Sequence, residues 1–393
     1  MPSADRVLIA GAGPVGLTAA AALVQAGVPV TVLEAGSDLS EESRASTFHP
    51  PTLDMLDRLG AAEALIAQGL KAPRFQYRSK QHGVLGQFDF GGIADLTAHP
   101  YRVQAEQSKL TRILLDQLRG RPEFEIAFDA RVRGVAQDPS GVTVTIERNG
   151  HTETRGGRWL IGADGARSDV RHALGIEFEG FTWPERFLVI STPFDFGAVI
   201  PGLVEVSYVA DPRRWHFLLQ IPGLCRVMFP IAAEESDELA LSGDFVQALM
   251  ATIVPGITRY EVAHVTLYKV HQRVARSFQA GRAFLVGDAA HINNPLGGMG
   301  MNGGIHDAVN LTARLIEAWR GARDEIARYD RQRRLVTLEA IQTQTIQNKR
   351  NLESDGDDFR RQLAEIATDP ARQREYLLRV SMIATLRRAQ ELG

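Results

Sequence analysis

The sequence contains one cysteine, Cys225, among 393 residues. A single cysteine excludes an internal disulfide and any zinc or iron–sulfur site that needs several cysteine ligands, and it favours a reducing compartment. The ten histidines show no spacing typical of metal ligands. We therefore expect a cytoplasmic protein without a metal site.

The sequence also lacks a strong excess of charge of either sign. Its formal net charge is −3 and its pI is near 6.4, so we expect no surface for nucleic acid or anionic lipid. The run from Val7 to Val24 is uncharged, but it contains three glycines and a proline and has no basic leader. We interpret it as part of a folded domain and not as a targeting segment or membrane span.

The order of the predicted elements indicates an α/β fold. Residues 6–10, 17–25 and 29–34 have the pattern of a strand, a helix and a second strand, which is a βαβ beginning. Helical spacing follows at 44–67 and 110–118. Residues 180–272 contain many short β runs separated by proline and glycine, with one helix near 244–252. After a strand at 283–286, helices are expected at 303–319 and over most of 325–390.

The segment from Gly11 to Gly16 matches the dinucleotide-binding fingerprint Gly-x-Gly-x-x-Gly between a strand and a helix, and Glu34 follows at about the expected distance. Glycines let the backbone approach a pyrophosphate, and the helix N-terminus contributes N–H groups and a partial positive charge. A carboxylate at the end of the second strand can accept hydrogen bonds from ribose hydroxyls. This segment alone does not distinguish NAD from FAD.

Two later segments carry further glycine-rich loops after predicted strands. In residues 162–171, Asp164 stands between two glycines, and Arg167 or Arg171 is available for a phosphate or a carboxylate. In residues 287–302, Asp288 follows a strand and can accept from polyol hydroxyls, and a loop rich in glycine leads into a helix. Such a loop directs N–H groups at one point, where they would stabilise an electron-rich edge such as that of a reduced flavin.

Together the three segments resemble the single-component FAD-dependent aromatic hydroxylases of the p-hydroxybenzoate hydroxylase family, over roughly residues 5–330. The resemblance implies a Rossmann-like FAD-binding domain formed by residues 1–72, 102–179 and 273–330. A sheet-rich substrate domain is implied at 73–101 and 180–272, followed by C-terminal helices at 331–393. It also implies that the AMP half of FAD is held by Gly11, Gly13, Pro14, Val15, Gly16, Glu34, Ala35 and Val132.

The resemblance assigns further residues to the rest of the cofactor. Asp164 is expected near the pyrophosphate or the NAD(P)H path, and Asp288 on the ribityl chain. Arg44 corresponds to the flavin-contacting arginine of the family, and Gln107 begins its Gln-x-x-(Leu/Val)-Thr-Arg run, whose glutamine touches the ribityl chain. The carbonyl of Pro295 would face the oxygen-reacting carbon of the flavin. The backbone expected to face the flavin ring is that of Gly298, Gly300, Met301 and Asn302.

The substrate site can be compared as well. Tyr208 begins a Tyr-x-x-x-Pro-Arg run like that of p-hydroxybenzoate hydroxylase, where the tyrosine helps to deprotonate the phenol, and it is our catalytic candidate. The positions of the benzoate clamp fall on Leu219 and Ile221, so that clamp is missing. We expect a mainly apolar pocket with Phe217, Leu219, Ile221 and Phe229 on one face. An acid could still be held by Arg74, Arg102 or Arg214, and acid–base groups near the substrate could be His49, His82 and His216, whereas His291 is expected to brace its loop.

The activity implied is hydroxylation of a phenolic or heteroaromatic small molecule with NAD(P)H and O2, through a flavin C4a-hydroperoxide. NADH or NADPH would bind transiently, because there is one dinucleotide fingerprint, and the acidic segment 38–42 favours NADH. The alternative is a flavin-dependent oxidoreductase of the same fold without ring hydroxylation, of the reductase or Baeyer–Villiger type. A homodimer is compatible with the C-terminal helices, which look like a cap or a dimer surface.

Overall fold

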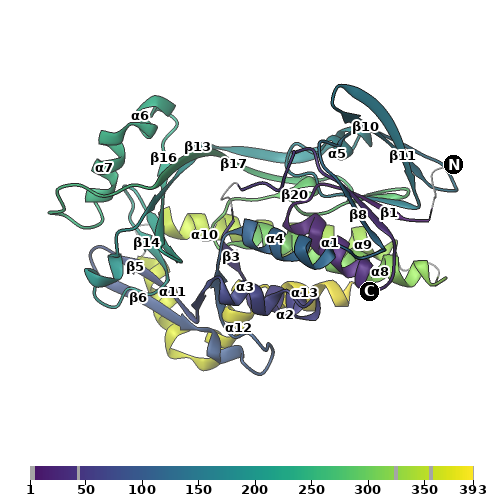
Figure 1. Cartoon of the computed structure of the whole chain (residues 1–393). Helices are drawn as coiled ribbons and strands as arrows, with labels where there is room; N and C mark the ends of the chain where they lie inside the picture. Colours follow the sequence, from purple (N-terminus) through teal and green to yellow (C-terminus); the bar gives the residue numbers. More distant parts are fainter. Residues whose placement is uncertain (1–4, 42–44, 323–325, 354–356, 393) are drawn as a thin grey trace.

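The computed structural model describes residues 5–41, 45–322, 326–353 and 357–392. Figure 1 shows the strands of one sheet at one end of the molecule and a second sheet with two short helices, α6 and α7, at the other. The long strands β13 (Phe178–Thr192) and β17 (His264–Ala275) run between the two ends. In the described part of the chain, no helix combines the length and the apolar character needed to cross a membrane.

The first sheet has six strands in the order β18-β19-β12-β1-β2-β8, all parallel except for β18. The central strands β1, β2, β12 and β19 are buried along their whole length and are mostly apolar, as expected for a parallel sheet that is covered on both faces. Their bounds are β1 (Val7–Ala10), β2 (Val30–Leu33), β8 (Phe124–Ala127), β12 (Trp159–Gly162), β18 (Gln279–Ala280) and β19 (Ala283–Leu285).

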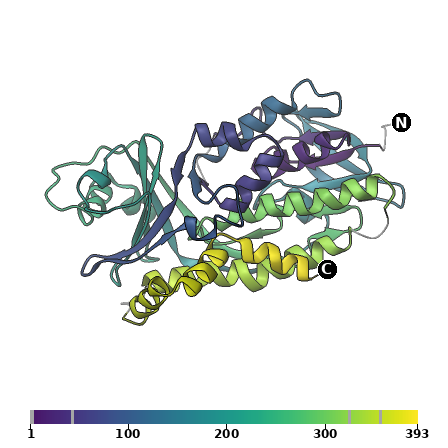
Figure 2. The ribbon, with the colours of Figure 1, turned by 90° about the horizontal axis from the view of Figure 1, so that it is seen from below.

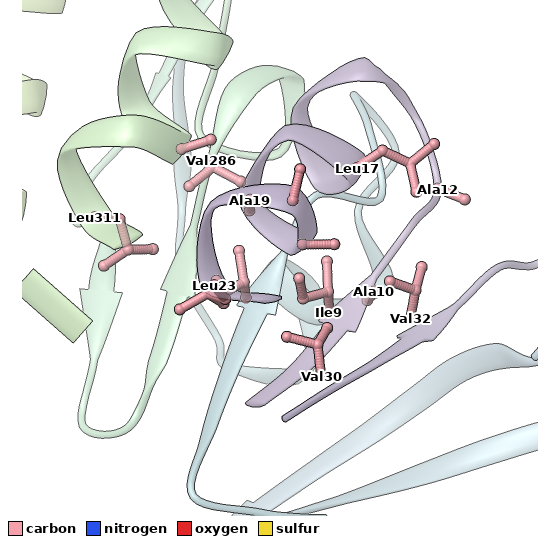
Figure 3. Close-up of a cluster of buried hydrophobic side chains, with 14 of the residues drawn as sticks. Ile9, Ala10, Ala12, Leu17, Ala19, Leu23, Val30, Val32, Val286 and Leu311 are labelled. Carbon is pink, nitrogen blue, oxygen red and sulfur yellow. The ribbon is translucent and has the colours of Figure 1, made fainter. Parts of the chain in front are cut away.

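Helix α1 (Pro14–Gln25) packs on this sheet between α4 (Gln107–Leu118) and α8 (Met299–Trp319). Figure 3 shows Leu17, Ala19 and Leu23 of α1 in one cluster of buried apolar side chains with strand residues such as Ile9. A three-stranded antiparallel sheet adds its apolar side chains to the same core; its strands are β9 (Arg131–Gln137), β10 (Val142–Arg148) and β11 (His151–Gly157). Burial of this continuous apolar core stabilises the sheet and so fixes the loops at the carboxyl ends of its strands.

The second sheet has eight strands in the order β20-β17-β13-β16-β15-β14-β5-β6. Strand β5 comes from early in the chain, yet it pairs in parallel with β14. The strands not yet bounded are β5 (Arg74–Ser79), β6 (Gly83–Asp89), β14 (Val206–Ala210), β15 (His216–Ile221), β16 (Leu224–Ile231) and β20 (His291–Ile292). The division into domains stays a prediction; β13 and β17 run across its boundaries at 179/180 and 272/273.

The two faces of the second sheet are covered by different elements. One face carries the aromatic cluster of Phe75, Tyr77 and Tyr208, here called the aromatic face, and side chains of the C-terminal helices pack on it. The opposite face packs against α6 (Asp237–Leu241) and α7 (Gly243–Ala251). Successive side chains of a strand point to opposite faces, so β13, β15, β16 and β17 each contribute to both clusters.

The C-terminal helices form one edge of the molecule in Figure 2 and reach toward β5 and β6. Helix α9 (Arg328–Val336) continues through a π-helical turn (Thr337–Gln342) into α10 (Thr343–Glu353). Helix α11 packs on β6, and α12 packs on the 3-10 turn η1 (Phe90–Ile93). The last three helices are α11 (Asp357–Thr368), α12 (Pro370–Val380) and α13 (Ile383–Glu391). These contacts are those of a cap on the second sheet, and a dimer surface formed by the same segment stays a prediction.

Two expectations for local structure need correction. The segment 44–67 is not one helix: β3 (Thr47–Phe48) comes first, and Gly60 separates α2 (Pro50–Arg58) from α3 (Ala62–Ala67). Strand β3 joins β7 (Arg102–Gln104) and β4 (Leu70–Ala72) in a small sheet. Helix α8 begins four residues before the expected Gly303, because the left-handed Gly298 caps it.

Candidate active site

The glycine loop between β1 and α1 is shaped by close backbone contacts. Gly11 has a φ of +100°, and a Cβ placed on it would lie 2.5 Å from the carbonyl oxygen of Ala163. A Cβ on Gly16 would lie 2.1 Å from the Gly11 carbonyl oxygen, whereas a Cβ on Gly13 would meet no atom within 4 Å. Gly11 and Gly16 therefore let the loop pack tightly, and Gly13 leaves an open surface for a ligand.

The N-terminus of α1 adjoins this open surface. Gly13 is the N-cap and Pro14 the first helical residue, and no side chain caps the helix. The first turn, which includes Val15, also contains no acidic residue. The N–H groups and the positive end of the helix dipole favour an anion at such a place, so the loop suits a pyrophosphate.

Glu34 lies directly after β2 and ties the glycine loop to the neighbouring strand. Its carboxylate accepts hydrogen bonds from the backbone N–H of Ala12 at 2.6 Å and of Gly36 at 2.8 Å. The side chain is half-buried and Ala35 beside it is exposed, so lone pairs of the carboxylate remain for ribose hydroxyls. Val132 lies near this strand end with its side chain in the core, so only its backbone could face a ligand.

Asp164 turns its carboxylate into its own loop. The carboxylate accepts from the Ser168 hydroxyl at 2.5 Å and from the Val170 N–H at 3.0 Å, at the start of α5 (Asp169–Ala173). Burial raises the pKa of Asp164, although both hydrogen bonds act against this rise. Only the backbone of Asp164 approaches the glycine loop, since a Cβ on Gly11 would lie 3.1 Å from its Cα.

The segment after β19 forms a 3-10 turn, η3 (Gly287–Ala289), against the same loop. Gly287 has a φ of +59°, and a Cβ on it would lie 3.0 Å from the Val15 side chain. Gly287 and Ala289 are buried, whereas the side chain of Asp288 is exposed between them. The carboxylate of Asp288 is thus presented at the surface beside the N-terminus of α1.

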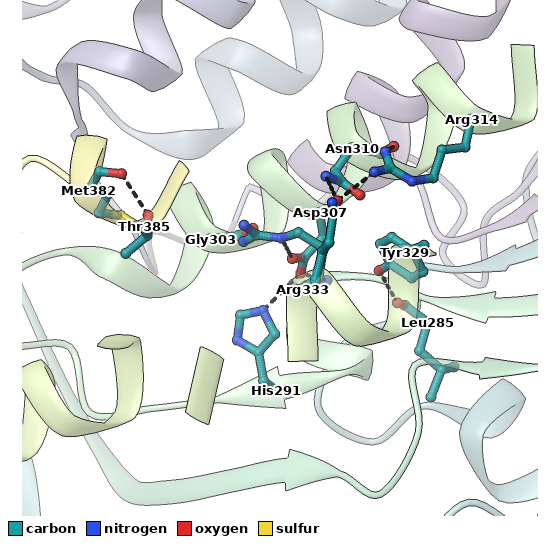
Figure 4. Close-up of polar contacts among 12 residues, drawn as sticks. Leu285, His291, Gly303, Asp307, Asn310, Arg314, Tyr329, Arg333, Met382 and Thr385 are labelled. Carbon is teal, nitrogen blue, oxygen red and sulfur yellow. Dashed lines mark hydrogen bonds and ion pairs between the residues drawn. The ribbon is translucent and has the colours of Figure 1, made fainter. Parts of the chain in front are cut away.

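A buried charged network holds this turn in place (Figure 4). Asp307 of α8 accepts from the Gly287 N–H at 3.2 Å, from His291 Nε2 at 2.8 Å and from Arg333 Nε at 2.6 Å. Burial alone would raise the pKa of Asp307, but the charges of Arg333 and His291 lower it overall. The contact agrees with the expectation that His291 braces its loop.

The loop that leads into α8 is a tight turn that exposes N–H groups. The Gly298 N–H donates to the Pro295 carbonyl at 2.9 Å, and Gly297 and Gly298 both have positive φ values. Helix α8 has no side-chain cap and no acidic residue in its first turn, which contains Gly300 and Met301. Like α1, it therefore offers an uncapped N-terminus to an electron-rich group.

Hydrogen bonds of Asn302 and His49 fix the conformation of this loop. The Asn302 amide donates to the carbonyls of Thr47 and Gly298 at 2.8 and 2.6 Å and accepts from the His49 N–H at 2.9 Å. His49 Nε2 lies 2.8 Å from the Gly297 carbonyl oxygen. The Asn302 side chain is therefore fully used, and only its backbone could face a flavin.

His49 was expected among acid–base groups near the substrate, and the structure corrects this. It is fully buried, and burial together with the charge of Arg102 lowers its pKa well below the usual value. Its role is to brace the loop. Gln107 is half-buried at the start of α4, where its N–H donates to the Ala45 carbonyl at 3.0 Å. The predicted flavin contact Arg44 lies outside the described residues.

The aromatic face approaches the loop from the second sheet. The ring of Tyr208 stacks on Tyr77 with centroids 5.2 Å apart and lies 5.8 Å from Phe217. The hydroxyl of Tyr376, from α12, donates to the hydroxyl of Tyr77 at 3.1 Å. Leu296 of the loop belongs to the same apolar cluster, so the loop and the aromatic face are joined.

Two predicted residues lie on the other side of the sheet. Phe217, Leu219 and Ile221 belong to the aromatic face, but Phe229 packs into the opposite cluster, so the expectation of one shared face is wrong for Phe229. His216 also lies on the opposite face, with its ring 5.3 Å from Phe229. Burial lowers the pKa of His216 to about 3, and nothing brings it to the substrate side.

The sequence and the structure of the chain were compared with those of known proteins. The family model described as FAD binding domain matches residues 5–344. The chain belongs to this family of FAD-binding proteins. It is 36% identical over 321 residues to a para-nitrophenol 4-monooxygenase from a Pseudomonas species, covering 80% of this chain and 79% of that protein.

Two further proteins are similar to this flavoprotein over almost its whole length. A 6-hydroxy-3-succinoylpyridine 3-monooxygenase from Pseudomonas putida is 34% identical over 359 residues, which is 90% of each protein. The crystal structure of p-nitrophenol 4-monooxygenase from Pseudomonas putida superposes with a TM-score of 0.90 and 31% identity, covering 96% of this chain and 98% of that one. The chain is thus a flavin-dependent monooxygenase that hydroxylates aromatic compounds, and the comparisons favour ring hydroxylation over the alternative chemistry.

The described residues of this flavoprotein fit FAD. The open surface at Gly13, the uncapped N-termini of α1 and α8, and the exposed carboxylate of Asp288 are features that a dinucleotide with a ribityl chain and an electron-rich ring would satisfy. When bound, FAD supplies transfer of electrons from NAD(P)H and activation of oxygen.

The sequence analysis missed Tyr77 and Tyr376 as members of the site. The alternation of Phe75 and Tyr77 in a short β run was a signal for the first. Tyr376 lies in an amphipathic helix 299 positions away from Tyr77, and no local pattern connects the two.

Proposed function

We propose that this monooxygenase hydroxylates a small phenol, or a heteroaromatic ring with a hydroxyl group, held between the loop 295–300 and the aromatic face. The observation that carries the proposal is the apolar cluster that joins Leu296 of the loop to Tyr208 and Tyr77. Support comes from two similar proteins whose named substrates both carry a ring hydroxyl, p-nitrophenol and 6-hydroxy-3-succinoylpyridine.

In this proposal Tyr208 contacts the substrate hydroxyl and helps to remove its proton, which makes the ring more nucleophilic. Tyr208 is buried beside Tyr77, so a ring placed there is shielded from water. Leu219 and Ile221 on the neighbouring strand extend the apolar lining. Exclusion of water by such a lining prevents unproductive loss of the activated oxygen.

The cofactor contacts are proposed on the same basis. Gly13 and Val15 would approach the pyrophosphate, Glu34 the ribose, Asp288 the ribityl chain, and the backbone of the first turn of α8 the flavin ring. The Pro295 carbonyl is already engaged by the Gly298 N–H, so its proposed orientation toward the flavin depends on this turn.

A substrate panel tests the function. Purified holoprotein should oxidise NADH faster when a monocyclic phenol or hydroxypyridine is present, consume O2 and yield hydroxylated product in a ratio near one to NADH. Oxidation that yields only hydrogen peroxide with every member of the panel would exclude the proposed substrate class. Parallel assays with NADH and NADPH test the predicted preference for NADH, and light scattering of the eluting protein tests a homodimer.

The variant Tyr208→Phe tests the catalytic assignment. Loss of one hydroxyl from a general acid–base step typically costs about 100-fold or more in kcat, whereas ring packing and substrate affinity should change little. Tyr260→Phe is a matched control, because Tyr260 is equally buried but lies on the opposite face and donates to the Val254 carbonyl. If both variants turn over like the parent enzyme, Tyr208 has no part in the chemistry.

A further inference from the structure

Arg102 is unusual among the buried arginines of the chain. In the described residues, four arginines are buried: Arg102, Arg171, Arg226 and Arg333. Arg226 and Arg333 each contact a carboxylate, and Arg171 donates to two carbonyl oxygens at 2.9 Å. Arg102 donates to one carbonyl, that of Val380, at the long distance of 3.4 Å. Its Nε and Nη1 atoms are buried without a hydrogen-bond partner in the described structure.

The surroundings of Arg102 do not neutralise its charge. The guanidinium lies 4.9 Å from the ring centroid of Phe75 and 5.1 Å from that of Phe90. Cation–π contacts with two rings and the C-terminal end of α12 offset part of the cost of removing the cation from water. A buried cation is nevertheless normally matched by an anion. No carboxylate of the described chain fills this role for Arg102.

Arg102 lies beside the proposed substrate site. Phe75, which stacks under the guanidinium, contacts Tyr77, and Tyr77 stacks on Tyr208. On the other side, Arg102 acts electrostatically on His49, which holds the Gly297 carbonyl of the flavin loop. The positive charge is therefore placed between the loop and the tyrosines that line the aromatic face.

The ionisable groups around Arg102 do not provide the missing negative charge. Burial raises the pKa of Tyr77 well above its usual value, and burial raises the pKa of Tyr376 to about 12, although Arg102 acts against both rises. Both tyrosines are therefore neutral near pH 7, as is His49, and Arg379 beside Tyr376 is a second cation. Because the described residues supply no anion at this place, a ligand is the source that we consider.

We propose that Arg102 supplies the positive charge that keeps the bound phenol in its ionised form, so that the enzyme selects acidic phenols. This inference rests on the proposed phenol hydroxylase function. Tyr208 would help to pass the phenolic proton to solvent, and the charge of Arg102 would stabilise the phenolate that remains, which is the more nucleophilic form of the ring. The role of Arg102 is electrostatic and needs no direct contact with the ring, because a charge acts over several ångströms in a dry site.

The ionisation of bound 4-nitrophenol tests this role directly, because the phenol and the phenolate absorb at different wavelengths. The ligand is titrated with pH in the presence of excess holoenzyme, for the parent chain, Arg102→Met and Arg102→Lys. We expect the acid dissociation constant of the bound ligand to fall about tenfold or more in Arg102→Met and to recover largely in Arg102→Lys. Arg119→Met, which changes an exposed arginine directly after α4, should leave it unchanged.

The outcomes separate three cases. If 4-nitrophenol and related phenols do not bind the parent enzyme at all, the proposed function fails. If they bind but ionise equally in the parent and in Arg102→Met, the inference about Arg102 fails, and a lower thermal midpoint of that variant would show a purely structural contact with α12. Should Arg102→Met not retain FAD, Arg102→Gln replaces it, and an unchanged ionisation of its bound ligand overturns the proposal in the same way.

Discussion

Replacing Arg333 with methionine should destabilise the protein more than almost any other single change outside the cofactor loops. Arg333 and Asp307 are both fully buried, and the Arg333 Nε–Asp307 Oδ1 distance is 2.6 Å. Arg333→Met keeps most of the side-chain volume but leaves the Asp307 carboxylate with His291 as its remaining side-chain partner. Removing one partner of a buried ion pair costs about 3–5 kcal/mol of the free energy of unfolding.

The loss should appear first at the cofactor. Asp307 also accepts from the Gly287 N–H, so a carboxylate that shifts or takes up a proton loosens the turn that carries Asp288. We expect FAD to be released at a lower temperature in Arg333→Met, measured by flavin fluorescence during heating, together with a lower urea midpoint by circular dichroism. Arg320→Met is the matched control, because Arg320 is exposed and should change the free energy of unfolding by less than about 0.5 kcal/mol.

A double variant gives the decisive comparison. Asp307→Asn keeps a hydrogen-bond acceptor for Gly287 but removes the charge, so adding it to Arg333→Met removes the uncompensated buried carboxylate. The double variant should therefore be destabilised by clearly less than the sum of the two single changes, with a coupling of about 0.5–3 kcal/mol. The reasoning is refuted if the free energy of unfolding of Arg333→Met lies within about 1 kcal/mol of that of the parent. It is also refuted if the destabilisation of the double variant equals the sum of the two single effects.

Three further changes have distinct expected signatures. Gly16→Ala puts a Cβ 2.1 Å from a backbone oxygen and should lower both the stability of the apoprotein and its affinity for FAD. Gly13→Ala places its Cβ in open space and should lower only the affinity for FAD. Thermal melts of the apoprotein and flavin titrations measure the two effects. His216 has a folded pKa of about 3, below its unfolded value of about 6.5, so its contribution to stability is full above pH 6.5 and is lost as the pH falls toward 3. His216→Leu should therefore lose about 2 kcal/mol less than the parent between pH 7.5 and pH 5 in urea unfolding, and equal losses would contradict this. Leu219→Ala should raise the KM for substrate and the fraction of peroxide released, because Leu219 lies on the aromatic face. Leu218→Ala changes a residue on the opposite face and should lower the free energy of unfolding by about 2–5 kcal/mol without changing the kinetics. Equal kinetic effects of the two variants would contradict the assignment of faces.

Strand β15 shows what the alternation of residues along one strand can predict. Alternation alone places Phe217, Leu219 and Ile221 on one face, and the structure agrees. The error for Phe229 arose on the neighbouring strand, because its face depends on register. The two-residue turn between Ile221 and Leu224 fixes that register, and a shift of one residue exchanges the two faces. The Pro222-Gly223 turn that sets this register is visible in the sequence.

His49 illustrates a different limit. A histidine before two prolines has no local feature that separates an acid–base group from a brace. Its function follows from contacts with Gly297 and Asn302, about 250 positions further along the chain. Such contacts depend on how α2 and α8 pack, which local propensity does not determine.

The sequence by itself determined the FAD-binding α/β fold and the places of the cofactor loops, because glycine positions, strand ends and helix starts are local features with strong steric requirements. Tertiary structure alone decided which face of the second sheet meets the loop. It also brought Tyr376 of α12 against Tyr77 of β5 and buried Arg102 where no carboxylate of the described residues pairs with it. These relations join segments far apart in the chain, and they are set by the packing of whole elements on a shared core, where burial and charge are determined collectively.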